Sequence, residues 1–310
     1  MRSNDMKNQT NYTNPVVTET NDELTITLQK KKQINWAILF KIIVYAVLIF
    51  GSVLLVFPFL WMLLSSFKTG DEATLRFTFF PEQWVFSNYA ELFTGTDFPI
   101  FKALGNTVLI EVSVIAIGTF VSAMAAFSFA KLKLQHRTFW LLFLMSGMMV
   151  PYAALMLPQY RAFDAMNMTD TLWPLILPGF FGNVSMIFFL VQYMRGIPNA
   201  YFEAARIDGA NHFTCFVAIM LPLIKTAIAA QVIFWFVGIW NDYFAPSLYL
   251  TSRDKMTLQV LLGQLNAGTS GKYLPMALAG AVLSSIPMLI IYVSCQKFFI
   301  ESLAISGVKG

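Results

Sequence analysis

Six apolar segments, each long enough to cross the roughly 30 Å hydrocarbon core of a bilayer, dominate the sequence. The chain is 57% hydrophobic, and only 12% of its residues are charged, against about 25% in an average soluble protein. Such a composition cannot cover a soluble core with a polar surface. Because lipid offers no partners to the backbone, the pattern predicts an all-α polytopic membrane protein with six transmembrane helices. The segments are about residues 36–66, 106–130, 138–158, 173–194, 226–250 and 275–299.

The first 33 residues differ in character from the rest of the chain. They are rich in Asn, Thr and Lys with little apolar clustering, so we expect a disordered cytoplasmic tail over 1–33. Residues 34–310 form one predicted transmembrane domain. Within its fourth segment, Pro178-Gly179 and Gly182 predict a break, which a membrane tolerates only where protein or water satisfies the freed backbone groups.

Basic residues are distributed unequally between the two sets of loops. If the N-terminus lies inside, twelve Lys and Arg residues flank the inner ends of the segments and seven flank the outer ends. Cytoplasmic loops carry an excess of these residues. The bias therefore predicts that both termini, and the loop over 195–225, lie in the cytoplasm.

That loop contains a charged stretch punctuated by proline and glycine. Pro198 suits the first turn of a helix, and Gly209 suits its end because glycine adopts positive φ without strain. Between them, Phe202, Ala205 and Arg206 fall on one helix face. We predict that this helix docks to a separate cytoplasmic protein, and the alternative is a solvated loop. The predicted contact residues are Tyr201, Phe202, Glu203, Ala204, Ala205, Arg206, Asp208 and Gly209.

Five motifs follow one another in order along the chain. They are Gly105-Asn106-Thr107, Leu157-Pro158-Gln159-Tyr160, Glu203-Ala204-Ala205 with Gly209 and Leu221-Pro222, Trp240-Asn241-Asp242-Tyr243-Phe244-Ala245-Pro246, and Gly307-Val308-Lys309-Gly310. In this order the chain resembles the MalG-like permease subunits of binding-protein-dependent carbohydrate ABC importers, with their EAA motif. The resemblance covers roughly residues 38–310. One departure is Thr226, where the family often carries a proline that would set how sharply the loop turns into the fifth helix.

The resemblance implies a fold, a function and a set of partners. The fold would be the type I ABC importer permease fold, and the chain would form half of a sugar translocation pathway in a bacterial cytoplasmic membrane. Residues 198–209 would be the coupling helix, and the C-terminal tail 300–310 could insert between ATPase subunits. The implied partners are a homologous permease in a heterodimer, two cytoplasmic ABC ATPase subunits, an extracellular solute-binding protein, the sugar and membrane lipid, but no nucleic acid.

Residues for catalysis or metal binding are scarce. The chain has two histidines and two cysteines, and His136 and His212 both fall in predicted cytoplasmic loops. Gly271-Lys272-Tyr273 lacks the upstream glycine of a phosphate-binding loop, and it has tyrosine where that loop requires serine or threonine. We therefore predict a transporter subunit without catalytic residues, metal or bound cofactor, whose ATP and Mg²⁺ are bound by a separate ATPase.

Polar residues inside the apolar segments are the candidate pathway positions. An ionised carboxylate at the bilayer centre costs roughly 2.5–3.5 kcal/mol, so Asp242 should face protein or a wet cavity. Amides, carboxylates and aromatic rings also suit the hydroxyls and C–H faces of a sugar, whereas the alternative is hydrogen bonding across helices. The predicted pathway residues are Trp240, Asn241, Asp242, Tyr243, Glu111, Gln159 and Tyr160.

The charges within the segments also bear on the substrate. No Lys or Arg lies deep in an apolar segment, which favours a neutral oligosaccharide over a sugar phosphate such as glycerol phosphate. A stand-alone secondary carrier is a further alternative, and it would need paired ionisable residues in the membrane. Only Glu111 and Asp242 could serve in that way.

Overall fold

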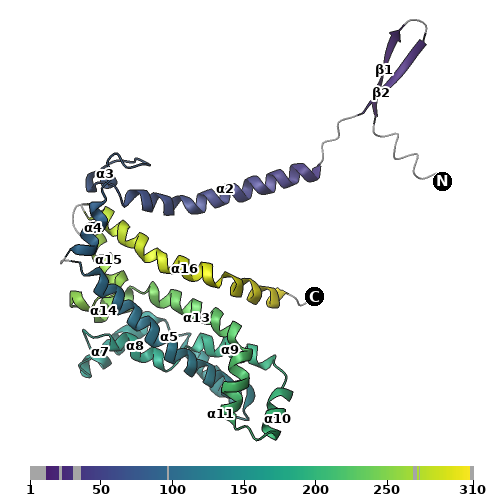
Figure 1. Cartoon of the computed structure of the whole chain (residues 1–310). Coiled ribbons are helices and arrows are strands. Elements are labelled where there is room, and N and C mark those ends of the chain that lie inside the picture. The colour runs from purple at the N-terminus through teal and green to yellow at the C-terminus, as the bar shows by residue number, and fades with distance from the viewer. Residues whose placement is uncertain are drawn as a thin grey trace. The chain divides into compact units, whose positions relative to one another are not determined.

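The computed structural model describes residues 12–20, 23–30, 36–95, 98–267, 271 and 273–307. These residues fall into two compact units, Met1–Leu60 and Trp61–Gly310, and each unit is described by itself. The first unit contains two strands and most of one long helix, whereas the second contains the remaining helices (Figure 1).

The first unit contains an antiparallel pair of strands, β1 (Tyr12–Thr20) and β2 (Glu23–Lys30). The pairing is irregular near Pro15, which has no N–H to donate to a ladder. These strands differ from the disordered tail that composition predicts for 1–33. The signal that was overlooked is the alternation of apolar and polar residues that a strand requires, at Leu24, Ile26 and Leu28.

The long helix α2 (Trp36–Ser65) follows the strands and runs without interruption through Pro58. Its segment Ile38–Ser65 has a mean hydropathy of 2.7, and none of that window is buried by protein. A strongly apolar exposed helix of this length is typical of a segment surrounded by lipid.

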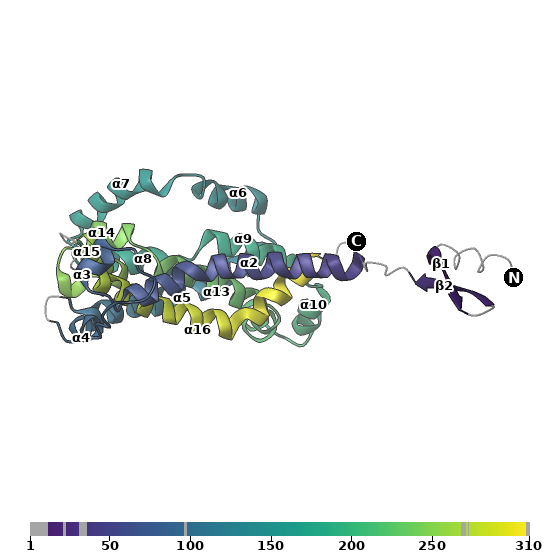
Figure 2. The same ribbon diagram turned by 90° about the horizontal axis from the view of Figure 1, so that it is seen from above.

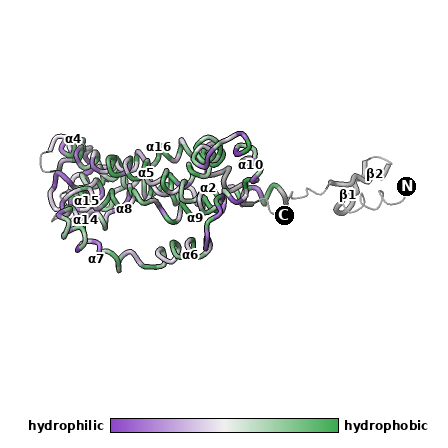
Figure 3. Tube along the Cα trace, turned by 90° about the horizontal axis from the view of Figure 1, so that it is seen from below, coloured by the Kyte–Doolittle hydropathy of each residue, from purple (hydrophilic) through white to green (hydrophobic). Residues whose placement is uncertain are grey.

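The second unit is helical throughout its described residues. Its elements are α3 (Gly70–Leu75), α4 (Ser87–Thr94), α5 (Ile100–Lys131), α6 (Arg137–Gly147), α7 (Tyr152–Ala165), α8 (Trp173–Phe180), α9 (Val184–Arg195), α10 (Ala200–Ile207), α11 (His212–Thr214), η2 (Cys215–Met220), α12 (Leu221–Leu223), α13 (Lys225–Trp240), α14 (Phe244–Tyr249), η3 (Arg253–Lys255), α15 (Leu258–Ala267) and α16 (Leu274–Gly307). Hydrophobic residues run along α5, α9 and α16, whereas hydrophilic residues gather around α10 (Figure 3).

Six spans can be assembled from these helices, as the sequence predicts. Four helical segments are long and apolar enough to cross a membrane singly: Ile38–Ser65, Ile100–Lys131, Trp173–Arg195 and Leu274–Gln296. Two bent pairs of helices, α6 with α7 and residues 212–223 with α13, raise this number to six among the described residues. The predicted all-α polytopic fold is confirmed for the second unit.

Two spans predicted as single helices are broken, so the prediction was wrong there. The third, 138–158, bends by 88° between α6 and α7, because Pro151 lacks an N–H and disfavours a helical residue before it. The fifth, 226–250, divides into α13 and α14 at Asn241 and Asp242. Figure 2 shows α6 and α7 along one side of the second unit, away from α16.

One other local prediction is confirmed, and one open point is answered. The fourth span is interrupted between α8 and α9, where Gly182 has a φ of 93°. The loop turns by 77° into α13, and this turn falls at Ile224, so it needs no proline at Thr226.

Helix α5 lies at the centre of the second unit and packs against α8, α9, α13 and α15. At Gly118, α5 lies directly against α8 and α13. A Cβ at this position would lie 2.4 Å from the carbonyl oxygen of Gly179 and 2.4 Å from the Trp235 ring. Four residues on, Ser122 Oγ donates to the Gly118 carbonyl (2.6 Å) and accepts from the Asn183 N–H (2.8 Å). The broken fourth span is therefore fixed to α5 by a small residue and a hydroxyl.

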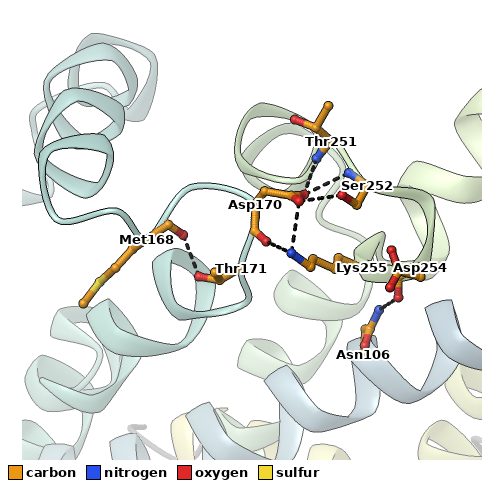
Figure 4. A network of polar contacts seen from close by, with 8 residues as sticks. All are labelled: Asn106, Met168, Asp170, Thr171, Thr251, Ser252, Asp254 and Lys255. Carbon is orange, nitrogen blue, oxygen red and sulfur yellow. Dashed lines mark hydrogen bonds and ion pairs between the residues drawn. The ribbon is translucent and has the colours of Figure 1, made fainter.

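A polar network joins the loop before α8 to the segment around η3 (Figure 4). The Asp170 carboxylate accepts from the backbone N–H of Thr251 (2.9 Å) and Ser252 (2.8 Å), from Ser252 Oγ (2.5 Å) and from Lys255 Nζ (3.1 Å). The hydrogen bonds from Ser252 are the main cause that holds the pKa of Asp170 well below its usual range. Asp170 also adopts a φ of 53°, which aspartate tolerates better than most residues.

The Gly105-Asn106-Thr107 motif contributes to the same region. Asn106 Nδ2 donates to the carbonyl oxygens of Asp254 and Met256, both at 3.0 Å. Thr107 Oγ1 accepts from the backbone N–H of Leu258 (2.9 Å), the first residue of α15. The motif thus binds the start of α5 to the loop before α15, a role that the sequence alone did not suggest.

Substituting the two glycines of α5 with alanine should shift stability in opposite directions. Gly105→Ala adds a methyl group in open space, and we expect it to stabilise the fold by about 0.5–1 kcal/mol. Gly118→Ala forces a Cβ against α8 and α13, and we expect it to destabilise the fold by about 1–3 kcal/mol. Thermal unfolding of the purified proteins in detergent measures both changes. Shifts in the same direction would contradict close packing at Gly118.

Asp170→Asn should destabilise the fold by about 1.5–3 kcal/mol, because it removes charge-assisted hydrogen bonds. Asp254→Asn is the matched control, since Asp254 contributes its backbone carbonyl to the network. Because the pKa of Asp170 is lowered in the folded state, its ionised carboxylate stabilises the fold at pH values above the ordinary aspartate pKa of about 3.9. This contribution is lost as the pH falls through the lowered pKa. The difference in melting temperature between wild type and Asp170→Asn should therefore be constant near neutrality and shrink only below about pH 4. Equal effects of both variants would exclude this role for Asp170.

Candidate functional site

The short helix α10 is anchored to the rest of the second unit by one aromatic residue. Phe202 is 9% exposed, and its ring centroid lies 6.0 Å from that of Phe127 in α5. Lys131, the last residue of α5, lies with Nζ 5.3 Å from the centroid of the same ring. Its ammonium also donates to the Ile197 carbonyl (2.6 Å) and to Asn199 Oδ1 (2.9 Å). The start of α10 is thus held to the end of a membrane span.

The other side of α10 is open. Ile207 is 86% exposed and Tyr201 is 54% exposed, which is unusual for large apolar side chains on a short polar helix. Glu203 and Ala204 are exposed beside them. The helix therefore presents a small mixed apolar and acidic surface that the described part of the chain does not cover.

The short helix predicted between Pro198 and Gly209 is present, with its start slightly shifted. It begins at Ala200 rather than at Pro198, and Gly209 follows its end with a φ of 86°, as predicted. Phe202 is buried and Ala205 half-buried, whereas Arg206, four residues after Phe202, is exposed.

Behind α10 lies the largest cluster of buried apolar side chains in the described second unit. Phe216, in the π-helical stretch η2, packs with its ring centroid 5.5 Å from that of Phe127. The cluster continues into α9 and the start of α13. Its fully or nearly buried members include Ala123, Ala126, Met186, Leu190, Val191, Met194, Cys215, Met220 and Ile224. Phe202 therefore belongs to a core shared by α5, α9, η2 and α13.

A second feature is a cavity of about 310 Å³ inside the helix bundle. Asp242 and Gln159, two of the predicted pathway residues, both line it. Asp242 Oδ1 also accepts from the backbone N–H of Ala245 (3.3 Å) at the start of α14. The remaining polar and aromatic lining residues are Thr107, Tyr152, Trp235 and Thr257.

The step between α13 and α14 directs neighbouring residues into different spaces. Asn241 and Tyr243 line a separate hollow of about 480 Å³ between α13, α15 and α16. Gln259, Ser284 and Ser285 supply its other polar groups. The residues Asn241, Asp242 and Tyr243, which we predicted to form one site, therefore line two different spaces. Asp242 lines the cavity of 310 Å³, and its two neighbours line the hollow of 480 Å³.

Three predicted pathway residues line neither hollow. Trp240 is 2% exposed and donates from Nε1 to the Ser284 carbonyl (3.1 Å), so it makes the bond across helices that was expected of Asn241 or Asp242. Tyr160 stacks on Tyr249 with centroids 6.0 Å apart. Glu111 is 3% exposed, and neither of its carboxylate oxygens has a hydrogen-bond partner among the described residues.

Several lining residues were missed because their signals are weak in a sequence. Trp235 sits in a long apolar helix where nothing marks one face, and Thr107 was noted only as part of a motif and not as a lining residue. Gln259 lies in the loop region after the fifth segment, where no helix was predicted. Only the helix-breaking Pro178 and Gly179, which also line the cavity of 310 Å³, could have indicated a site, since such residues in a membrane often border a cavity.

Known proteins resemble this chain over most of its length. An arabinooligosaccharides transport system permease protein AraQ of Halalkalibacterium halodurans is 30% identical over 264 residues, which cover 84% of this chain and 94% of that protein. A diacetylchitobiose uptake system permease protein NgcG of Streptomyces coelicolor is 31% identical over 261 residues, which cover 83% of this chain and 85% of that protein.

A solved structure shares the fold. One chain in the crystal structure of a bacterial ABC transporter involved in the import of the acidic polysaccharide alginate matches with a TM-score of 0.76 at 22% identity. The match covers 87% of this chain and all of the other. Residues 118–299 match the family described as binding-protein-dependent transport system inner membrane component. This chain therefore belongs to the binding-protein-dependent transport system inner membrane component family.

Proposed function

We propose that this chain is a transmembrane permease subunit of an ATP-driven importer of sugars or oligosaccharides. The observation that carries the proposal is α10, a short helix fixed to the bundle through Phe202 and exposing Tyr201, Glu203 and Ile207. A surface of this kind suits a cleft in a separate protein better than it suits water. Membership of a binding-protein-dependent transport family and similarity to two oligosaccharide permeases support the same assignment.

The proposed partner at α10 is one of two cytoplasmic ATPase subunits. Residues Tyr201 to Gly209 would contact it, and Glu203 would pair with a basic group in its cleft. ATP and Mg²⁺ would be bound and used there, because the chain lacks a phosphate-binding loop. Both termini would then lie on the same, cytoplasmic side of a bacterial plasma membrane.

The proposed mechanism is alternating access between two arrangements of a permease heterodimer. ATP binding would close the ATPase pair and move the two coupling helices together, opening the pathway to the outside, where a solute-binding protein delivers sugar. Hydrolysis would reset the inward-open arrangement. Lys131 and Phe202 support this coupling, since they join α10 directly to the long span α5.

A neutral saccharide fits the two hollows better than a sugar phosphate does. As far as the structure describes them, their lining residues include no Lys or Arg, which a phosphate would require. Hydroxyl, amide and aromatic groups suit sugar instead. A stand-alone secondary carrier is less well supported, because Glu111 lies outside the cavity that Asp242 lines.

Glu203→Ala should uncouple ATP hydrolysis from transport in the reconstituted importer. Glu203 is exposed, so its loss should leave the fold of the chain intact while it removes a contact with the ATPase. We expect the stimulation of ATPase activity by binding protein plus sugar to be lost, together with sugar uptake. Ser87→Ala, an exposed substitution in α4, serves as the control. Normal stimulation and uptake by Glu203→Ala would show that α10 does not couple the ATPase, and the carrier hypothesis would return.

Gln159→Leu should slow sugar uptake, because it removes the amide from the cavity while it keeps the size of the side chain. Loss of one hydrogen bond of about 0.5–1.5 kcal/mol corresponds to a decrease of roughly 2- to 10-fold. Tyr160→Phe is the neighbouring control, since Tyr160 stacks on Tyr249 away from the cavity. Uptake of radiolabelled sugar into proteoliposomes gives the comparison. A larger decrease for Tyr160→Phe than for Gln159→Leu would place the pathway elsewhere.

A further inference from the structure

The loop between α2 and α5 buries two of its charged side chains and exposes several large aromatic ones. Lys68 is completely buried and Glu72 is 5% exposed. Phe77 is 85% exposed and Phe86 is 64% exposed. This combination is unusual for a loop surrounded by water, because Lys and Glu are almost never fully buried unless they are paired.

The buried charges of this loop are satisfied without water. Lys68 Nζ donates to the Thr78 carbonyl and lies 4.3 Å from the centroid of the Trp61 ring. Glu72 Oε1 accepts from Thr78 Oγ1 (2.6 Å) and from the Glu82 N–H (2.9 Å). Burial raises the pKa of Glu72, but these hydrogen bonds and the nearby Lys68 together hold that pKa below its usual value. Glu72 is therefore ionised at neutral pH inside the loop.

The backbone of the loop is closed in the same way. Asn88 Nδ2 donates to the carbonyl oxygens of Ser66 (2.9 Å) and Lys68 (3.0 Å). The Val85 N–H donates to the Phe67 carbonyl (2.7 Å). These bonds satisfy backbone groups that would otherwise need water, which is the condition for placing irregular backbone near lipid.

The exposed rings form two clusters that start at the end of α2. Phe77 stacks on Trp61 in the last turns of α2, with centroids 4.5 Å apart. Phe67 contacts Trp84 (5.6 Å) and Phe86 (5.3 Å). The aromatic surface of the loop is thus continuous with the end of a membrane span.

We propose that this aromatic surface lies in the interfacial region of the lipid bilayer, at the membrane face where α2 ends and α5 begins. Both ends of the loop are held at that face, because α2 ends at Ser65 and α5 begins at Ile100. Aromatic side chains favour this region, and an amphipathic segment binds there through its apolar face. The occupant is phospholipid, and the site does not depend on which substrate the importer carries.

Spin labels at single cysteines in the full importer, reconstituted in phosphatidylcholine–phosphatidylglycerol vesicles, test the proposal. The labels replace Phe77 and Phe86, and Cys215→Ala and Cys295→Ala remove the natural thiols. We expect collisions with oxygen, which concentrates in lipid, to exceed collisions with a water-soluble nickel chelate. Labels at Asp71 and Gln83, which line a polar hollow of about 360 Å³ in the same loop, should show the reverse.

Two outcomes would overturn the proposal. Nickel access at 77 and 86 equal to that at 71 and 83 would mean that water covers the rings. Little access to either reagent would mean that another protein covers them, and a change on adding the solute-binding protein would identify it.

A second measurement avoids labels: brominated phospholipid should quench a larger share of tryptophan fluorescence in the wild type than in Trp84→Phe. Equal quenching would also contradict lipid contact.

Discussion

The close approach of α5 to α8 and α13 is the constraint on which the second unit depends. At Gly118 there is no room for a side chain between α5 and the Gly179 carbonyl, so the broken fourth span packs directly on the backbone of α5. Ser122 then satisfies the backbone that the break exposes. Without this contact, the cavity of 310 Å³ would lose its walls, because both α8 and α13 line it. One glycine thereby determines the space through which we propose that sugar passes.

In our proposal, few contacts connect α10 to the membrane spans. Phe202 enters a core that reaches from α5 to α13, and Lys131 ties the preceding loop to the same span. Apolar cores are densely packed and resist deformation, so displacement of α10 must move the helices around Phe202 together. The π-helical stretch η2 lies within this core. In our proposal this core transmits motion, whereas the exposed side of α10 receives it.

Hydrophobic periodicity and helix-breaking residues predicted much of this fold from the sequence. The number of spans, the break near Gly182 and the end of α10 at Gly209 follow from them. The 88° bend before α7 was missed, although Pro151 marks its position in the sequence. The division of Asn241 and Asp242 between two hollows was also missed, since only the backbone turn between α13 and α14 separates them. Hydrophobic periodicity cannot identify the pathway residues of helices that are apolar on every face.

The geometry at Asp170 limits which residues evolution can place there. Its φ of 53° is readily adopted by glycine, asparagine and aspartate and by few other residues. Its four donors, one of them an ammonium group, favour an anion. Glycine and asparagine meet the first demand alone, and glutamate meets the second alone. Aspartate is the residue that meets both, so its replacement in a related chain should be accompanied by a change at the partner positions 252 and 255.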